Sequence, residues 1–181
     1  LAAQLVDLED RKNKGISAQP LLQDHQNEIK SYWRILQNLE NLPSKEVLDF
    51  LVKQSADVAP DKRLAALNSM IAVKSELKDS PIAPVSQRLG IMLTDPSLEV
   101  RTKVVAGIGK LKVKDEIPRL VQLTSSKEVS FARQVFETLS ELSRDGNKVE
   151  VETALRQKQK SVMDPHLSRK LSELIDSLTN T

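Results

Sequence analysis

Cysteine is absent from the 181 residues, and histidine occurs only twice, as His25 and His166. Without cysteine the chain forms no disulfide and offers no thiolate for catalysis or metal binding. The two histidines lie far apart in the sequence, so the paired spacing of a zinc site is missing. The acidic residues do not follow the spacing of a calcium-binding loop either. We therefore expect no catalytic residues, no cofactor and no metal site, and we predict that the chain is not an enzyme.

Aromatic residues make up only 3% of the chain and there are five glycines, whereas apolar residues reach 39%. Long helical proteins pack aliphatic ridges into grooves, so this composition predicts an all-α protein. Charged residues reach 29%, and no apolar run approaches the roughly 18–20 residues that a transmembrane helix needs. We therefore expect a soluble domain with no membrane span within this chain.

Neither sign of charge dominates, because the formal net charge is only +2. Residues 1–80 contain 11 basic and 12 acidic side chains, and residues 81–181 contain 16 and 13. A nucleic-acid-binding surface normally needs a clear excess of basic residues. We therefore do not expect a nucleic-acid partner.

Residues 1–43 form a segment of their own, which we interpret as an N-terminal helical hairpin or cap. A helix is expected over residues 1–14, and a second over 21–42 after a break around Gly15 and Pro20. The second helix has an apolar seam with spacings of 3 and 4. Such a seam usually docks on a neighbouring helix, although pairing with a second chain stays open, as does the oligomeric state. The seam positions are Leu22, His25, Ile29, Tyr32, Leu36 and Leu39.

From residue 44 onward the apolar pattern repeats. Val100, Val104, Ile108 and Leu111 define one stripe, which returns 31 residues later and again after another 36. A period of about 30–40 residues built from two helices is typical of an α-solenoid. The later stripes are Phe131, Val135, Leu139 and Leu142, then Leu167, Leu171, Ile175 and Leu178, with a weaker match at Leu64, Leu67 and Ile71. The expected helix pairs are 44–55 with 61–78, 81–94 with 97–112, 114–125 with 127–144, and 147–161 with 164–179.

The residues between the expected helices agree with this division. Asp95-Pro96 and Asp164-Pro165 each place a capping carboxylate before a proline that suits the first helical position. Gly146 follows Asp145 where a residue with positive φ would end a helix. We therefore expect helices to begin at both Asp-Pro pairs and one to end near Gly146.

The stripe, the loop Asp95 and the pair Val100-Arg101 together resemble HEAT repeats of the armadillo-like α-solenoid family. The resemblance is best over 82–142 and weaker over 44–78 and 147–178, and residues 1–43 do not share it. It implies a short right-handed α-solenoid of about four antiparallel helix pairs, with 44–181 as one continuous domain. In that family the repeated arginine bonds the loop acid of its own or an adjacent unit, so the resemblance implies that Arg101 and Asp95 are structural. Arg63, Arg133 and Arg169 fall near the equivalent position in the other units.

The segment Gly107-Ile108-Gly109-Lys110 superficially looks like a phosphate-binding loop. That loop requires a glycine where Val104 stands and Ser or Thr where Leu111 stands, at a strand-to-helix turn. Here the segment is expected in the middle of a helix. We therefore interpret Gly107 and Gly109 as points where a neighbouring helix approaches closely.

The repeat architecture and the lack of any recognisable catalytic site predict a non-enzymatic scaffold or adaptor that presents a helical-repeat surface to a protein partner. Two alternatives stay open: a nucleic-acid-binding HEAT-like protein and an accessory subunit of an enzyme. Because the second helix of each pair builds the inner face, the candidate partner-binding surface comprises Lys103, Lys110, Gln134, Glu137, Glu141, Lys170 and Glu173.

Trp33, the one tryptophan, is expected to pack the N-terminal hairpin against the first repeat. The chain starts at Leu1 without an initiating Met, and we expect a fragment or a processed form. The compartment stays open, with the cytoplasm favoured.

Overall fold

The computed structural model describes residues 19–179, which form helices and contain no strand. The all-α class expected from composition is confirmed for this part of the chain. The expected helix over 1–14 and the side chain of Leu22 lie outside what is described. In order, the α-helices are α2 (Gln19–Glu40), α3 (Lys45–Gln54), α4 (Pro60–Glu76), α5 (Ala83–Met92), α6 (Leu98–Lys110), α7 (Ile117–Leu123), α8 (Val129–Leu142), α9 (Lys148–Ser161) and α10 (Pro165–Thr179). A short 3₁₀ helix, η1 (Lys114–Glu116), leads into α7, and a tight turn, η2 (Ser143–Asn147), joins α8 to α9.

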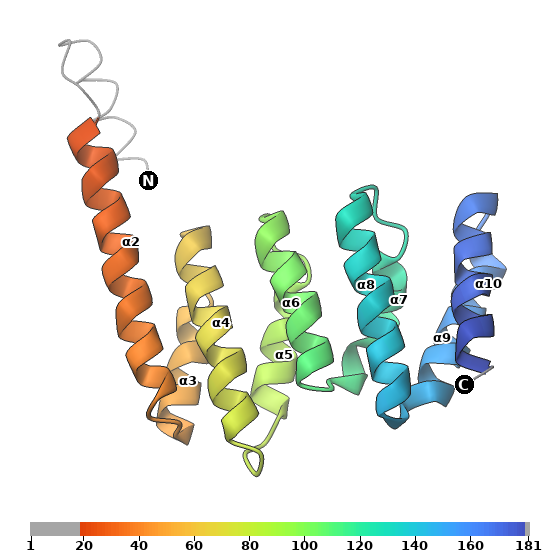
Figure 1. Cartoon of the computed structure of the whole chain (residues 1–181), viewed down its shortest axis with the longest axis horizontal. Coiled ribbons are helices and arrows are strands. Elements are labelled where there is room, and N and C mark those ends of the chain that lie inside the picture. Colours follow the sequence, from red (N-terminus) through yellow and green to blue (C-terminus); the bar gives the residue numbers. More distant parts are fainter. Residues whose placement is uncertain (1–18, 180–181) are drawn as a thin grey trace.

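The helices lie in two rows (Figure 1). One row contains α3, α5, α7 and α9, and the other contains α2, α4, α6, α8 and α10. Consecutive helices pack on each other as α3 with α4, α5 with α6, α7 with α8, and α9 with α10. These are the helix pairs predicted from the apolar pattern, with ends that differ by a few residues.

The helix starts are only partly as predicted. Asp164 caps α10, because its Oδ1 accepts the N–H of His166 at 2.9 Å and α10 begins at Pro165. The corresponding prediction for Asp95 and Pro96 is wrong: α6 begins at Leu98, and Ser97 is its N-cap. Asp95 Oδ1 instead accepts the N–H of Ser97 at 2.9 Å, within the loop. Two loop residues therefore separate Asp95 from the start of α6, whereas Asp164 directly precedes α10.

The repeated apolar stripes form the core between the rows. The predicted burial of Val104, Ile108, Val135, Leu139, Leu171 and Ile175 is confirmed, since none is more than 2% exposed. The seam of α2 packs on α4, with Leu36 buried and Tyr32 and Leu39 half-buried. His25, which the sequence places on this seam, is exposed. Gly146 has a φ of 94° and ends the α8 segment as predicted.

Two glycines mark close approaches between helices, and they lie in the last turn of α6 rather than in the middle of a helix as expected. A Cβ on Gly107 would lie 2.4 Å from Cδ1 of Ile71 on α4. A Cβ on Gly109 would lie 2.8 Å from Oε2 of Glu141 and 3.2 Å from Cγ2 of Thr138, both on α8. The interpretation of these glycines as packing positions is confirmed, and the helical conformation around them does not form a phosphate-binding loop.

Candidate partner-binding surface

A buried arginine joins the first two helix pairs. Arg63 of α4 donates from Nε and Nη2 to the two carboxylate oxygens of Asp95, each at 2.7 Å. Its Nη1 donates to the carbonyls of Asp57 and Val58, at 3.1 and 2.7 Å, in the loop before α4. The hydrogen bond to Asp95 raises the pKa of Arg63 further above its usual value, although burial opposes this. The arginine therefore connects its own loop to the next one.

Arg101 of α6 repeats half of this arrangement. Its Nη1 donates to the carbonyls of Asp95 and Pro96 at 2.7 and 3.3 Å. Towards the next unit, Nη2 lies 3.7 Å from Oε1 of Glu128, and the guanidinium lies 5.5 Å from the centre of the Phe131 ring. Arg101 is thus a structural residue, as expected. It bonds the backbone carbonyl of Asp95, whereas Arg63 bonds the carboxylate.

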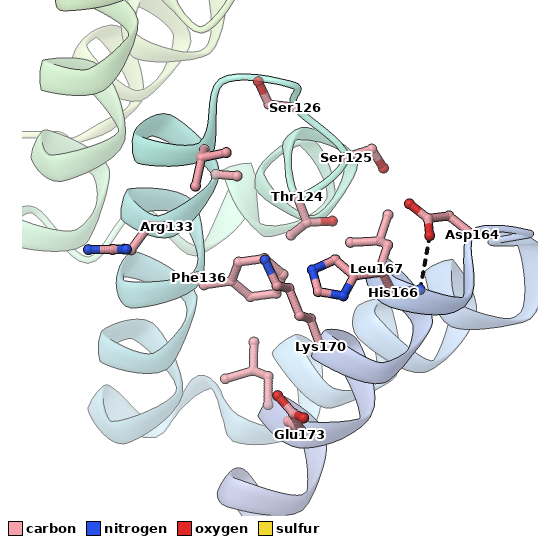
Figure 2. A pocket seen from close by; sticks show the side chains of 13 residues that line it. Thr124, Ser125, Ser126, Arg133, Phe136, Asp164, His166, Leu167, Lys170 and Glu173 are labelled. Carbon is pink, nitrogen blue, oxygen red and sulfur yellow. Dashed lines mark hydrogen bonds between the residues drawn. The ribbon is translucent and has the colours of Figure 1, made fainter.

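The next position in the series carries no arginine. Ala132 stands on α8 where the 31-residue offset places the equivalent of Arg101. Arg133, one residue later, is exposed, and Figure 2 shows its side chain directed away from α10. Arg169 pairs with Glu173 on its own helix at 3.0 Å. Arg133 and Arg169 therefore do not continue the series.

A hollow of about 580 Å³ lies between α8 and α10, which we call the α8–α10 hollow (Figure 2). Its apolar lining includes Val129, Ala132, Phe136 and Leu167. Asp164 lies at one end, bonded to the N–H of His166, and Lys170 reaches the middle from α10. Hydroxyl groups of Thr124, Ser125 and Ser126 complete the wall on the α7 side.

A second concave region crosses α2, α4, α6 and α8. Two hollows of about 730 and 370 Å³ share Trp33, Asn68, Lys103 and Ala106, so we treat them as one feature, the central groove. Trp33 is half-buried and packs against the core, in line with its expected packing role, but it also lines the groove. Oδ1 of Asn68 is buried and has no hydrogen-bond partner in the described residues. The central groove thus combines an aromatic anchor with polar and charged groups.

The structure divides the seven predicted surface residues between these two features. Lys103, Lys110 and Gln134 line the central groove, whereas Lys170 and Glu173 line the α8–α10 hollow. Glu137 and Glu141 line neither of them, and Glu141 instead lies over Gly109. All seven are exposed except Gln134, which is half-buried.

The sequence supports two interpretations of Trp33, a packing residue and an exposed anchor for a partner, and the structure places it half-buried in the central groove. Sequence reasoning missed Ala132, which the 31-residue offset aligns with Arg101. The absence of the repeated arginine at this one position is the signal that could have identified it.

Neither a metal-binding cluster nor a helix suited to span a membrane is found among residues 19–179. Within residues 19–179 no three His, Asp or Glu side chains gather in a way that could hold a metal ion. No helix in the same range is long and apolar enough to cross a membrane. No protein-family model matches the chain, and no curated protein matches its sequence.

Proposed function

We propose that this chain is a non-enzymatic adaptor, a short right-handed HEAT-like α-solenoid that binds a protein partner along the central groove. The observation that carries this proposal is the position of Trp33, half-buried at the junction of the two hollows that make up the groove. Tryptophan is enriched among the residues that dominate binding energy at protein interfaces. A half-buried ring already held by the core loses little conformational freedom on binding.

The chemistry of the central groove favours a protein over a nucleic acid. Leu64, Leu98 and Ala106 contribute apolar surface beside Trp33. Charges of both signs border it, with Lys103 close to Glu99 on α6. Phosphates along a nucleic acid would meet carboxylates as well as ammonium groups. A protein segment with mixed charges and one apolar anchor fits this surface better.

The non-enzymatic part of the proposal is supported by where the two histidines lie. His25 is on α2 and His166 on α10, at opposite ends of the row of helices (Figure 1), and both are exposed. Neither belongs to a metal-binding cluster among residues 19–179, and no hydrogen bond joins either imidazole to a hydroxyl group of these residues. General acid–base catalysis needs such groups within hydrogen-bonding distance of each other.

Affinity capture with crosslinking, carried out on the full chain, tests the proposal. We expect the captured partner to crosslink beside the central groove and to be lost from Trp33→Ala and Lys103→Glu. Two matched variants on α3, in the other row of helices, serve as controls: Phe50→Ala for the aromatic change and Lys53→Glu for the charge reversal. Retention of the partner by both groove variants, or its loss only from the α3 variants, would overturn the assignment.

A further inference from the structure

A hollow of about 560 Å³ lies where α8 ends, α9 begins and α10 ends (Figure 1). Gly146, with a φ of 94°, lets the chain change direction between α8 and α9 within a few residues. This turn brings Arg144 of η2 and Lys148 of α9 to the same hollow. We call it the serine hollow, and its lining consists of Ser140, Ser143, Arg144, Lys148, Ser177 and Leu178.

The charged side chains that line the serine hollow are all positive. Arg144 and Lys148 are its two charged residues, and no acid lines it. The α8–α10 hollow and both hollows of the central groove each include a carboxylate. Neither cation forms an ion pair or a side-chain hydrogen bond among residues 19–179. Asp145, which lies between them in the sequence, is paired with Lys112 at 2.7 Å. Both cations are therefore available to an anion.

Ser143 places a buried hydroxyl group in the serine hollow. The residue is only 5% exposed, and its hydroxyl forms no hydrogen bond within residues 19–179. Buried hydroxyl groups normally have a hydrogen-bond partner. The oxygen is not sealed off, because Asn68 Oδ1 is the one side-chain atom of the described residues that is both sealed and unpartnered. The hydroxyl of Ser143 is therefore a free donor that is reached from the hollow.

The other two serines of the hollow differ from Ser143. Ser140 donates its hydroxyl to the carbonyl of Phe136 at 3.0 Å, and Ser177 donates to that of Leu174 at 2.7 Å. Such bonds to carbonyls of the same helix are common for serine, and they use the hydroxyl hydrogen. Ser143 lies one turn after Leu139 and makes no such bond. Its hydrogen is thus left for a ligand.

The start of α9 adds a partial positive charge. Lys148 is the first residue of this helix, and Asn147 before it provides no side-chain cap. The amide of Asn147 instead donates from Nδ2 to the carbonyl of Leu142 at 3.1 Å. The N-terminal end of a helix favours anions. Helix start, two cations and a buried donor therefore coincide in one hollow.

We infer that the serine hollow binds the phosphate group of a phosphate monoester. Ser143 donates its hydroxyl to one phosphate oxygen, while Arg144 and Lys148 neutralise the charge. A phosphorylated side chain carries about 1.5–2 negative charges at pH 7 and three acceptor oxygens, so it can engage all three groups together. A carboxylate has one charge and two oxygens, which matches this set of donors less well.

The source of the phosphate that we favour is a phosphorylated serine or threonine of a protein partner. This assignment rests on the proposed adaptor function, whereas the phosphate site itself does not. A guanidinium can bond two oxygens of one phosphate side by side, and an ammonium adds a second, adaptable charge. Phosphorylation of a partner would then strengthen its binding through a surface separate from the central groove, because the two features share no lining residue.

NMR titration of the isotopically labelled full chain with N-acetyl-O-phospho-L-serine amide tests the site. N-acetyl-L-glutamic acid amide is the matched probe with a single carboxylate. We expect saturable shifts around Ser143, Arg144 and Lys148, with the phosphorylated probe binding more tightly. Shifts scattered over lysines elsewhere, or equal binding of both probes, would overturn the inference. Inorganic phosphate distinguishes the sources: weaker binding than the phosphoserine probe supports a phosphorylated protein, and tighter binding contradicts that source.

Two variants make the test specific. Ser143→Ala removes a hydroxyl that bonds nothing in the described chain, so it should fold normally and weaken probe binding about tenfold. Arg144→Gln removes one cation and should weaken binding by a similar factor. Arg133→Gln, at another exposed arginine, is the matched control and should leave binding unchanged. Unchanged binding in Ser143→Ala, or an equal loss in Arg133→Gln, contradicts the site.

The groove variants separate this inference from the proposed function. Trp33→Ala and Lys103→Glu should bind the phosphoserine probe as the wild type does, because neither residue lines the serine hollow. Probe binding at the hollow, combined with retention of the partner by both groove variants, contradicts the groove alone. Loss of the partner from the groove variants, without any probe binding at the hollow, contradicts the phosphate site alone.

Discussion

Arg63 and Asp95 are joined by two hydrogen bonds of 2.7 Å, and their side chains are only 11% and 6% exposed. The arginine belongs to α4, whereas the acid belongs to the loop before α6. A charged pair removed from water this far stabilises a fold only when both partners are present. This pair therefore makes the joint between the first two helix pairs sensitive to single substitutions.

Arg63→Ala should lower the free energy of unfolding by about 3–5 kcal/mol, because it leaves the carboxylate of Asp95 buried without its partner. The substitution also removes the donor of the Asp57 and Val58 carbonyls. Urea denaturation measures the effect. Arg156→Ala is the control, since Arg156 pairs with Glu152 at the surface and should contribute less than about 0.5 kcal/mol. Similar losses in the two variants would show that the Arg63 pair is not important for stability.

The free energy of unfolding should fall at acidic pH because the carboxylate of Asp95 becomes protonated. Burial alone would raise the pKa of Asp95, but hydrogen bonds from Arg63 and the Ser97 N–H, with the charges of Arg63 and Arg101, hold it below its ordinary value of 3.8. A carboxyl with a lowered pKa in the folded state stabilises the fold above its unfolded pKa. That contribution is lost as the pH falls from about 4 through the lower, folded pKa.

Urea unfolding at a series of pH values between about 6 and 2.5 measures this dependence. Asp95→Asn keeps an acceptor for the Ser97 N–H but removes the titrating group. It should be less stable than the wild type at neutral pH and should lose less stability on acidification. An unchanged pH dependence in Asp95→Asn would assign the acid sensitivity to other carboxyl groups.

Ile108→Ala should destabilise the domain by about 2–5 kcal/mol, because it opens a cavity in the core between α6 and its neighbours. Ile108 is fully buried. Leu98→Ala on the same helix is the matched control, since Leu98 is 37% exposed and should change the stability by much less. Thermal or urea unfolding compares the two. Equal effects would contradict the predicted alignment of the apolar stripe with the core.

Charge reversal at Lys103, Glu137 or Lys170 should change the free energy of unfolding by no more than about 0.5 kcal/mol, because all three side chains are exposed.

We expect binding to mixed-sequence DNA and RNA to be weak or absent at physiological salt. A nucleic-acid-binding surface would show affinity that falls steeply with salt, by roughly one unit of logarithmic slope per phosphate contacted. Tight, salt-sensitive binding that Lys103→Glu weakens would replace the protein-adaptor proposal with the nucleic-acid alternative.

Much of the helical organisation follows from the sequence because it depends on local spacing. The stripe from Val100 to Leu111 and its later copies predict which side of each helix is buried, since apolar residues three and four apart share one face. Asp164 caps α10 as predicted because a cap and its helix lie within a few residues of each other. Asp95 shows the limit of such local reasoning, because a competing partner from another helix pair holds its carboxylate.

Composition therefore determined the all-α class, and the apolar periodicity determined the helix pairs and the buried positions of the described chain. Only the tertiary structure decided that Arg63 bonds an acid 32 residues away, that Trp33 lies beside Lys103, and that α8 and α10 leave a hollow at Ala132. Each of these depends on how successive helix pairs stack. That stacking sets the distance between side chains of different helices, and the spacing of residues along one helix does not contain it.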